Sequence, residues 1–315
     1  MKEFTFCSFT YNQEQLITQQ LESIKYQINT FGKEIRCSYL LADDHSTDST
    51  VRTVEDWLEK NSSLFDSVRL CVADRNQGIV RNYENALNNI STDCFKIMAG
   101  DDLYFRNNVF SAYDSGSFII SPMINMLDDG TVVNGYYSFI RKLIMCGDSS
   151  ERIKRFMIEQ FRYGEWIPAP GVFIKKNLAD EGLFEALKPF SWIEDSPEFN
   201  YLAGSEKSEA VIISTPLVVY RTDSGISTKA NKPNPRYKND EEFLKKTIRT
   251  RVSGLPRIID PYHYMKAVSL IPNYVRAALN KEVNSRLKEF DLNMRREEAQ
   301  AAEYIRMIMD AAKVS

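Results

Sequence analysis

The first third of the chain alternates between short apolar segments and longer amphipathic segments. The short segments have the length and composition of buried strands, and the segments between them carry apolar residues at helical spacing. Such an alternation predicts an α/β fold with a mainly parallel sheet flanked by helices on both faces. The strands are expected at Phe4–Phe9, Ile35–Ala42, Val68–Ala73 and Cys94–Met98, and the helices at Gln13–Ile28, Asp48–Lys60 and Ile79–Ile90.

Polar residues suited to begin helices precede the first two of these helices. Asn12 is the expected N-cap of the first helix, and Ser46 or Thr47 that of the second. In a parallel sheet, ligands bind beyond the carboxyl ends of the strands. We therefore expect the loops after the four strands to converge on one crevice; these loops contain Tyr11-Asn12, Asp43-Asp44, Asp74–Gly78 and Gly100–Asp102.

The middle of the chain is less regular, and its last part is helical. A turn is expected at 128–130 (DDG), and a linker rich in Lys, Asn and Pro precedes the helical residues 240–315, which are interrupted at Pro256, Pro261 and Pro272. Further strands are expected at Phe118–Ser121, Thr131–Ser138, Gly171–Lys175, Val211–Ser214 and Leu217–Tyr220, and helices at Ser150–Arg162 and Trp192–Leu202.

The composition is that of a soluble protein, with 43% hydrophobic and 26% charged residues. The longest apolar runs fall short of a membrane span, the N-terminal residues do not resemble a secretion signal, and the five cysteines form no C-x-x-C pair. We therefore expect buried, unpaired cysteines and a cytoplasmic location.

The charge is unevenly distributed along the chain. Residues 229–296 contain sixteen Lys/Arg and seven Asp/Glu, a local charge of +9, which leaves −12 for the rest of a chain whose net charge is −3. This balance argues against nucleic acid as a partner. Solvated helix faces explain the basic part, and contact with anionic lipid at the inner membrane face is the alternative.

Several common kinds of site are missing. The chain has only two histidines, His45 and His263, which argues against histidine-based metal cages and Ser-His-Asp catalysis. Neither G-x-G-x-x-G after the first strand nor G-x-x-x-x-G-K-[ST] occurs. The segment DDHSTDST resembles a calcium loop, but it lacks the glycine at the sixth position and the glutamate at the twelfth.

Carboxylates at strand ends are the chemistry that remains. Asp101 and Asp102 follow a predicted strand directly, and Gly100 before them allows the close approach of a ligand. Mg²⁺ or Mn²⁺ commonly binds one or two such carboxylates together with substrate phosphates. The alternative is the acidic first turn of a following helix.

Six segments, taken in order and spacing, closely resemble glycosyltransferase family 2, whose fold is GT-A. The resemblance covers about the first 105 residues, resumes at 169–184 and 192–199, and does not include residues 226–315. It is carried by FTYNQEQLITQQLESI, LLADDHSTDST, DRNQGIVRNYENAL, KIMAGDD, APGVFIKKNLADEGLF and WIEDSPEF.

The resemblance implies two functional halves within residues 1–228, a nucleotide-binding half (1–105) and an acceptor half (106–228), followed by a basic helical extension (229–315). Thr10 and Tyr11 would line the base pocket, Asp44 would accept the imide N–H of a uracil-type base, and Asp43 would support the loop. The implied nucleotide-sugar-binding set is Thr10, Tyr11, Asn12, Asp44, Asn76, Gly78, Asn82, Asp101 and Arg221. Arg75 and Arg81 are further candidates for phosphate contacts.

The metal ligand would be Asp102, with Asp101 beside it on the ribose side. The chain departs from the family pattern at Asp223, which stands where many relatives have a histidine and is an alternative metal ligand. In the acceptor half, Asp195 would be the catalytic base, and Glu194 would hold it or the acceptor. Trp166 and Trp192 could stack on sugars or pack in the core.

The expected function is therefore that of an inverting glycosyltransferase that uses Mg²⁺ or Mn²⁺, with a UDP-sugar favoured as donor. The expected acceptor is a saccharide or lipid-linked saccharide of a bacterial surface polysaccharide such as O-antigen or capsule. The C-terminal helices are a candidate surface for homo-oligomers. Two alternatives are a sugar-phosphate nucleotidylyltransferase, although FTYNQEQ lacks that class's glycine-rich loop, and a non-catalytic nucleotide-sugar-binding scaffold.

Overall fold

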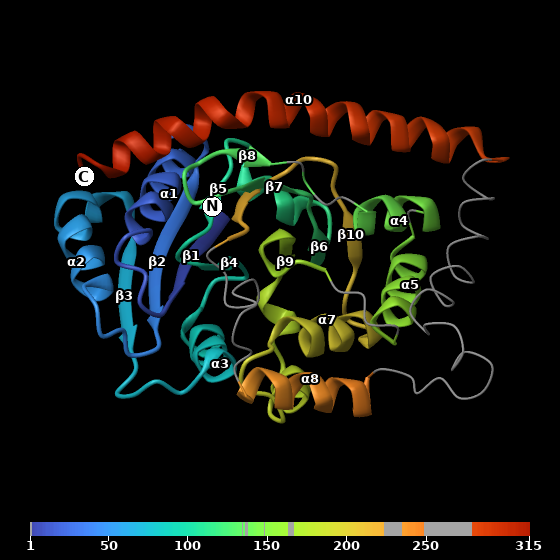
Figure 1. Cartoon of the computed structure of the whole chain (residues 1–315), viewed down its shortest axis with the longest axis horizontal. Helices are drawn as coiled ribbons and strands as arrows, with labels where there is room; N and C mark the ends of the chain where they lie inside the picture. Colours follow the sequence, from blue (N-terminus) through green and yellow to red (C-terminus); the bar gives the residue numbers. More distant parts are fainter. Residues whose placement is uncertain are drawn as a thin grey trace.

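The computed structural model describes residues 2–133, 135, 138–147, 149–162, 167–223, 235–248 and 279–315. Its first part is a four-stranded sheet in which all pairs are parallel, in the order β3-β2-β1-β4 (Figure 1). The predicted alternation of strands and helices is confirmed. The elements are β1 (Lys2–Thr10), α1 (Ile17–Phe31), β2 (Ile35–Asp43), α2 (Thr50–Asn61), β3 (Ser67–Val72), α3 (Ile79–Asn89) and β4 (Cys94–Ala99).

The predicted N-caps of the first two helices are wrong. The N-cap residues are Leu16 and Ser49, and neither makes a side-chain capping hydrogen bond. Asn12 instead has a left-handed φ of 54°, and its Oδ1 accepts from the backbone N–H of Thr47 at 2.8 Å. The polar residues ahead of these helices therefore connect the β1–α1 loop to the β2–α2 loop.

Two smaller sheets follow, formed mainly by residues 106–228, the half of the chain expected to bind the acceptor. One has the order β5-β11-β7-β8 and the other β10-β6-β9, and both mix parallel and antiparallel pairs. Their strands are β5 (Leu103–Tyr104), β6 (Phe118–Ile120), β7 (Met123–Met126), β8 (Val132–Val133), β9 (Val172–Ile174), β10 (Ala210–Ile212) and β11 (Val218–Arg221). The helices are α4 (Ser138–Cys146), α5 (Ser150–Arg162), α6 (Glu181–Leu187) and α7 (Asp195–Gly204), with short 3-10 turns at Ser62–Leu64, Val109–Asp114, Ala169–Gly171 and Lys176–Leu178.

Most predicted elements of this half are present, with two corrections. Among the described residues of the expected strand Thr131–Ser138, only Val132–Val133 form a strand, and Ser138 already begins α4. The buried residues Phe139, Ile140, Leu143 and Ile144 have helical spacing. The turn at 128–130 is confirmed, because Leu127 N–H donates to Thr131 O at 2.9 Å and Gly130 has a φ of +84°.

The C-terminal part contributes two described helices, α8 (Pro235–Thr247) and α10 (Lys281–Ala312). α10 lies along one long side of the molecule, whereas α3 and α8 lie on the opposite side (Figure 1). Predicted helix is thus confirmed where residues 240–315 are described. Residues 249–278, with the three predicted proline breaks, His263 and part of the basic segment, lie outside the described residues.

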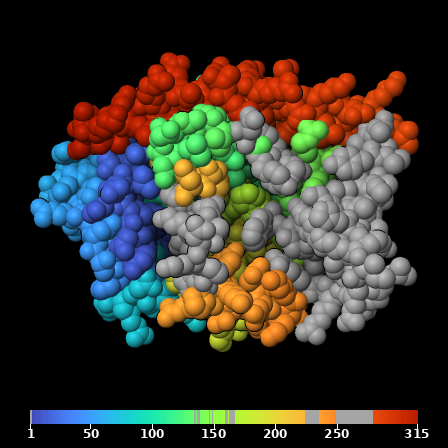
Figure 2. All heavy atoms as spheres, in the orientation of Figure 1, coloured from blue at the N-terminus to red at the C-terminus, as the bar shows by residue number. Residues whose placement is uncertain are grey.

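α10 joins the two halves by packing on α1, α4, β7 and β8. Its buried face includes Tyr304, whose hydroxyl donates to the buried backbone oxygen of Tyr104 at 2.8 Å. Nε and Nη2 of Arg106 both donate to Glu297 Oε2 at 3.2 Å. A space-filling view shows α10 as a continuous ridge along this side (Figure 2).

Among the described helices, none combines the length and apolarity needed to cross a bilayer. The expectation of unpaired cysteines is confirmed for Cys7, Cys37, Cys71 and Cys94, of which Cys7 and Cys37 are buried. The four cysteines lie one in each strand of the first sheet, and Cys71 and Cys94 are half-buried. The side chain of Cys146 lies outside the described residues.

We expect Tyr304→Phe to destabilise the fold by about 1–3 kcal/mol, because it leaves a buried carbonyl oxygen without its donor. The ring contacts with Tyr26 and Phe105 are retained in this variant. The measurement is denaturant unfolding. Leu292→Ala is the matched control, because Leu292 is 71% exposed on the same helix and should change stability by less than about 0.5 kcal/mol. Equal effects of the two variants would contradict this account of α10.

Candidate active site

The carboxyl ends of the parallel strands meet at one edge of the first sheet, as predicted. Thr10 is paired with Asp43 in the β1–β2 register, and Phe9 with Ala99 in the β1–β4 register. Backbone hydrogen bonds continue past the strand ends, from Asp44 N–H to Thr10 O at 3.0 Å and from Gly100 N–H to Phe9 O at 3.1 Å. The loops that carry the predicted site residues therefore begin side by side.

Asp43 supports these loops from within, as expected. Its carboxylate is completely buried. It accepts hydrogen bonds from Thr10 Oγ1 at 2.7 Å, from Ser46 N–H at 2.7 Å and from Ser46 Oγ at 2.6 Å. Thr10 is itself buried and directs its hydroxyl toward Asp43. The structure thus gives Thr10 a loop-supporting contact.

Asp44 holds the loop between β3 and α3. Its two carboxylate oxygens accept from the backbone N–H groups of Gln77 at 2.7 Å and Gly78 at 2.8 Å. Burial raises the pKa of Asp44, and these two hydrogen bonds oppose the rise. Each oxygen has a second lone pair with which it can accept a further donor. Asp44 therefore ties the β2 end to the start of α3.

Gly78 is required at the start of α3 for two reasons. Its φ is +93°, a conformation that L side chains rarely adopt. A Cβ atom at this position would also lie 2.9 Å from the backbone oxygen of Ser191, in the loop ahead of α7. The close approach of these two segments brings the loop after β3 and the loop ahead of α7 together beside the strand ends.

The remaining predicted donor-binding residues differ in accessibility. Tyr11 is 42% exposed, and Asn76 is exposed. Asn12 is exposed and its side chain contacts Thr47. Asn82 is buried; its Nδ2 donates to Ala42 O at 3.0 Å, while its Oδ1 has no hydrogen-bond partner in the described structure. Asn82 therefore holds the strand end and retains one acceptor.

The candidate phosphate contacts Arg75 and Arg81 are exposed. Arg81 pairs with Glu84 one turn further along α3, with Nη1 2.5 Å from Oε2. A surface ion pair of this kind contributes little to stability. A phosphate could therefore replace Glu84 as the partner of Arg81.

Asp102 is the most strongly constrained of the predicted metal ligands. It is only 2% exposed, and its Oδ1 accepts from the backbone N–H of Arg221 at 2.9 Å. Burial, and next the charge of Asp101, raise the pKa of Asp102 well above its ordinary value. Asp101 is half-buried. The two adjacent acids therefore face different surroundings.

Arg221 is placed inside the protein and not toward an open phosphate site. Its side chain is completely buried. The guanidinium donates to Asp101 O at 3.0 Å, Asp128 O at 3.0 Å and Gln19 Oε1 at 2.8 Å. These contacts fix Asp101 and Asp102, the two residues after Gly100 at the end of β4, which we call the metal corner. Asp223, two residues beyond, is exposed.

A divalent cation fits this corner as a partial site. Within the described residues, no group of three His, Cys, Asp or Glu side chains forms a complete cage. Two adjacent carboxylates, one of them buried beside the other's charge, match the protein share of a Mg²⁺ or Mn²⁺ site that substrate phosphates complete. A bound cation would relieve the repulsion that raises the pKa of Asp102.

Three acids gather at the first turn of α7. Glu194 and Asp195 are half-buried, and Glu198 is buried. Asp195 Oδ1 accepts from Ser196 N–H at 2.6 Å, and Glu198 Oε1 accepts from the Tyr83 hydroxyl at 2.7 Å. A helix N-terminus favours negative charge. The predicted base therefore lies at a helix N-terminus beside two other acids.

Burial and mutual repulsion raise the pKa values of these acids. Burial, and then the charge of Asp195, raise the pKa of Glu194 to about 8. Burial raises the pKa of Glu198 to about 7, against the opposing effects of Tyr83 and Lys96. Burial also raises the pKa of Asp195. At neutral pH, Glu194 thus holds a proton beside Asp195.

Lys96 connects these acids to the metal corner, and the sequence analysis did not identify it. It is buried in β4, and its Nζ donates to Val172 O at 2.7 Å and Ala169 O at 3.3 Å. Burial lowers the pKa of Lys96 to about 8, while Glu198 and Asp102 act in the opposite direction. The only sequence signal was a charge inside an apolar strand, CFKIMA. The charge of Lys96 therefore interacts with both Asp102 and Glu198 of α7.

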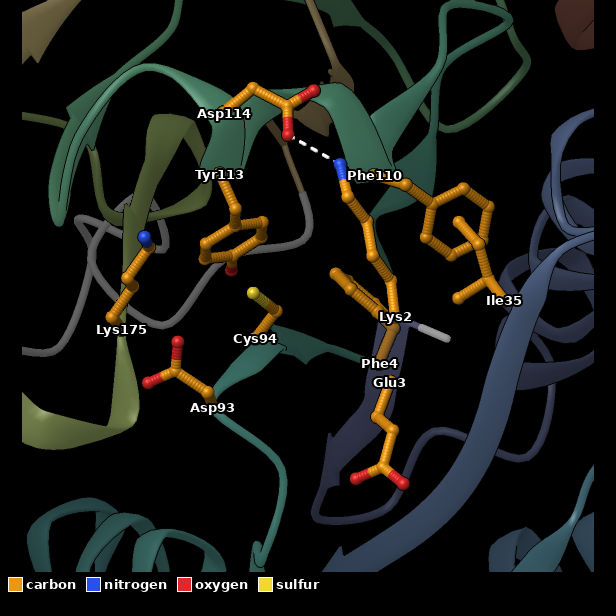
Figure 3. Close-up of a pocket in the computed structure, with 10 residues that line it drawn as sticks. All are labelled: Lys2, Glu3, Phe4, Ile35, Asp93, Cys94, Phe110, Tyr113, Asp114 and Lys175. Carbon is orange, nitrogen blue, oxygen red and sulfur yellow. Dashed lines mark hydrogen bonds and ion pairs between the residues drawn. The ribbon is translucent and has the colours of Figure 1, made fainter.

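A separate cavity of about 370 Å³ lies at the opposite edge of the sheet (Figure 3). It is lined by the first residues of β1, β2 and β4, and Lys2 and Asp114 form an ion pair there with Nζ 2.5 Å from Oδ1. None of the predicted site residues lines it.

Comparisons with known proteins agree with this geometry. Residues 5–114 match the family model described as Glycosyl transferase family 2. No curated protein matches the chain. The structure of S. aureus TarS 1–349 in complex with UDP-GlcNAc has a TM-score of 0.53 at 13% identity, covering 98% of this chain and 92% of that one. A longer S. aureus TarS structure has a TM-score of 0.50 at 14% identity, covering 96% and 55%. These likenesses confirm the expected fold.

We expect Glu194→Gln to stabilise the protein at pH 8 and to have little effect near pH 4.5. Glu194 has a pKa of about 8 in the folded chain and an ordinary value of 4.5. Between these values unfolding releases a proton, so the stability of the wild type falls as pH rises. Glutamine does not ionise, so the stability of the variant does not fall with pH for this reason. Melting temperatures across pH 4.5–8.5 measure it, with exposed Glu303→Gln as control. A constant difference at all pH values would contradict the raised pKa.

Proposed function

We propose that the chain is a glycosyltransferase that moves a sugar from a UDP-sugar to a hydroxyl of a saccharide acceptor, with inversion and with help from a divalent cation. The match of residues 5–114 to the family model Glycosyl transferase family 2 and the fold shared with TarS support this proposal. The observation that carries this proposal is that Asp101-Asp102, held by Arg221, and the segment ahead of the α7 acids, held against Gly78 and Val80, lie beside the strand ends.

The proposed donor site lies over the ends of β1, β2 and β4. Tyr11 offers an exposed ring to the base, and Asp44 accepts from the base while it holds Gly78. Asn76 and the open acceptor of Asn82 lie along the loop and helix that follow β3. The complex of TarS with UDP-GlcNAc, a protein of the same fold, supports a uridine nucleotide as donor.

Mg²⁺ or Mn²⁺ would be held by Asp101 and Asp102 together with the donor's diphosphate, and it would stabilise the negative charge of the leaving nucleotide. The chain's own contribution is to position this pair. Arg221 fixes the backbone of Asp101 and supplies the N–H that holds Asp102. Asp223, exposed two residues later, is an alternative further ligand.

Asp195 is the proposed base. It accepts the proton of the acceptor hydroxyl as the acceptor oxygen attacks the anomeric carbon. The bond from that carbon to the phosphate oxygen breaks at the opposite side, and UDP leaves. Glu194, protonated at neutral pH, can donate a hydrogen bond to the acceptor or to Asp195 without adding a charge.

The acceptor class follows from family analogy: we propose a saccharide or lipid-linked saccharide in bacterial surface polysaccharide synthesis. Basic residues within 229–296 would place the enzyme against anionic lipid on the inner membrane face.

The donor site can be tested by ligand-induced stabilisation. UDP with Mn²⁺ should raise the melting temperature more than dTDP or GDP with Mn²⁺, since a ligand at 100 times its Kd stabilises a protein by about 2.7 kcal/mol. In Asp101→Asn and Asp102→Asn, the part of the rise in melting temperature that requires Mn²⁺ should be lost. Asp114→Asn, at the opposite edge of the sheet, should retain it. An Mn²⁺ effect that persists in both corner variants would refute the proposed metal site.

The base can be tested by kinetics. Asp195→Asn should lower kcat by about 10²–10⁴-fold with UDP binding retained. Glu194→Gln, which resembles the protonated glutamate, should keep most of the activity. Because the pKa of Asp195 is raised, wild-type activity should fall on acidification at a pH above the ordinary aspartate value of about 4. Transfer at the wild-type rate by Asp195→Asn would exclude it as the base.

A further inference from the structure

One oxygen of Asp240 accepts three consecutive backbone N–H groups. Asp240 belongs to α8, and its Oδ2 lies 2.8 Å from Ser191 N, 2.6 Å from Trp192 N and 3.1 Å from Ile193 N. The side chain is only 6% exposed. Hydrogen bonds to a buried carboxylate are charge-assisted and stronger than those between neutral groups. This contact is an unusually dense attachment for a single side chain.

The segment held by Asp240 reaches both parts of the candidate active site. Its next residues are Glu194 and Asp195, which begin α7. In the other direction, the backbone oxygen of Ser191 accepts from Val80 N–H at 3.2 Å, beside Gly78 at the start of α3. Displacement of this short segment would therefore move the acids and the donor loop together.

α8 itself is attached to the body through few side chains. Its fully buried positions are Asp240 and Leu244, one turn apart. The ring of Phe243 packs edge-on against Phe190 at 5.3 Å between centroids. α8 lies at the molecular surface on the side opposite α10 (Figure 2). The buried carboxylate thus attaches this helix directly to the segment ahead of α7.

We propose that Asp240 is a positioning residue, which sets the geometry of Glu194 and Asp195 by fixing the backbone of residues 191–193. Asp240 itself contacts neither substrate nor the reacting atoms. This inference rests on the proposed function and deepens it. It assigns to α8, outside the matched family segment, a part in catalysis.

The experiment compares Asp240→Ala and Asp240→Asn with Glu242→Ala, an exposed residue of the same helix. Amide hydrogen exchange of the resting full-length protein reports directly on the clamp. In Asp240→Ala, the N–H groups of residues 191–193 should exchange at least about tenfold faster, because they lose their acceptor. Asp240→Asn keeps a carbonyl oxygen at that place and should restore much of the protection.

Kinetics then separates positioning from folding. In Asp240→Ala, kcat should fall by about 10–100-fold, the size expected for a displaced catalytic group, while the KM for UDP-sugar changes less. The acid limb of the pH profile should also move, since Asp195 interacts with the charges of Glu194 and Glu198, which in turn face Tyr83 and Lys96, and a shifted loop alters these distances. Partial unfolding lowers kcat without moving this limb.

Two results would overturn the inference: unchanged exchange at residues 191–193 in Asp240→Ala, or faster exchange with wild-type kcat and pH profile. Failure of the proposed function is a different result, namely no sugar transfer by the wild-type protein. The exchange measurement does not depend on activity, so the two failures are distinguishable.

Discussion

The structure depends on the placement of buried carboxylates at the edge where parallel strands end. An ionised carboxylate is costly to bury unless hydrogen bonds or opposite charges compensate it. Asp43, Asp44, Asp102 and Asp240 are all buried, and each accepts at least one backbone N–H. Asp44, Asp102 and Asp240 accept N–H groups from other segments, and Asp43 also accepts the Thr10 hydroxyl from β1, so each of these four acids fixes the relative position of two segments. The hydrogen bonds that offset the cost of burying these carboxylates therefore also hold the loops of the site in place.

Adjacent acids with unequal surroundings recur at this edge. In the pair Asp101-Asp102, the second member is buried and held, and the first is half-buried. In the pair Glu194-Asp195, the charge of Asp195 helps to keep a proton on Glu194 at neutral pH. Repulsion between neighbours can be relieved by a cation in the first case and by a proton in the second. In the function that we propose, the first pair acts on the diphosphate and the second on the acceptor hydroxyl.

The sequence predicted those parts of the fold that depend on local periodicity. The strands and helices of residues 2–99 follow from apolar spacing within each segment, and their carboxyl-end loops contain most of the predicted site. The N-caps were wrong because Asn12 and Ser46 bind across loops instead of binding the next helix. Side-chain partners more than a hundred residues away, such as that of Arg221, have no local signature. Lys96 and Asp240 were missed for the same reason, since only the fold brings their partners to them.

The two described C-terminal helices act on the molecule in different ways, although both lie outside the matched family segment. α10 buries an apolar face across the two halves, so its effect is on stability. α8 is short and buries little, but it brings one charge to three amides next to the acids of α7. Burial area alone would rank α10 as the more important helix. For chemistry the order is reversed, because catalysis depends on the position of a few atoms, and one carboxylate oxygen fixes the segment from which those acids begin.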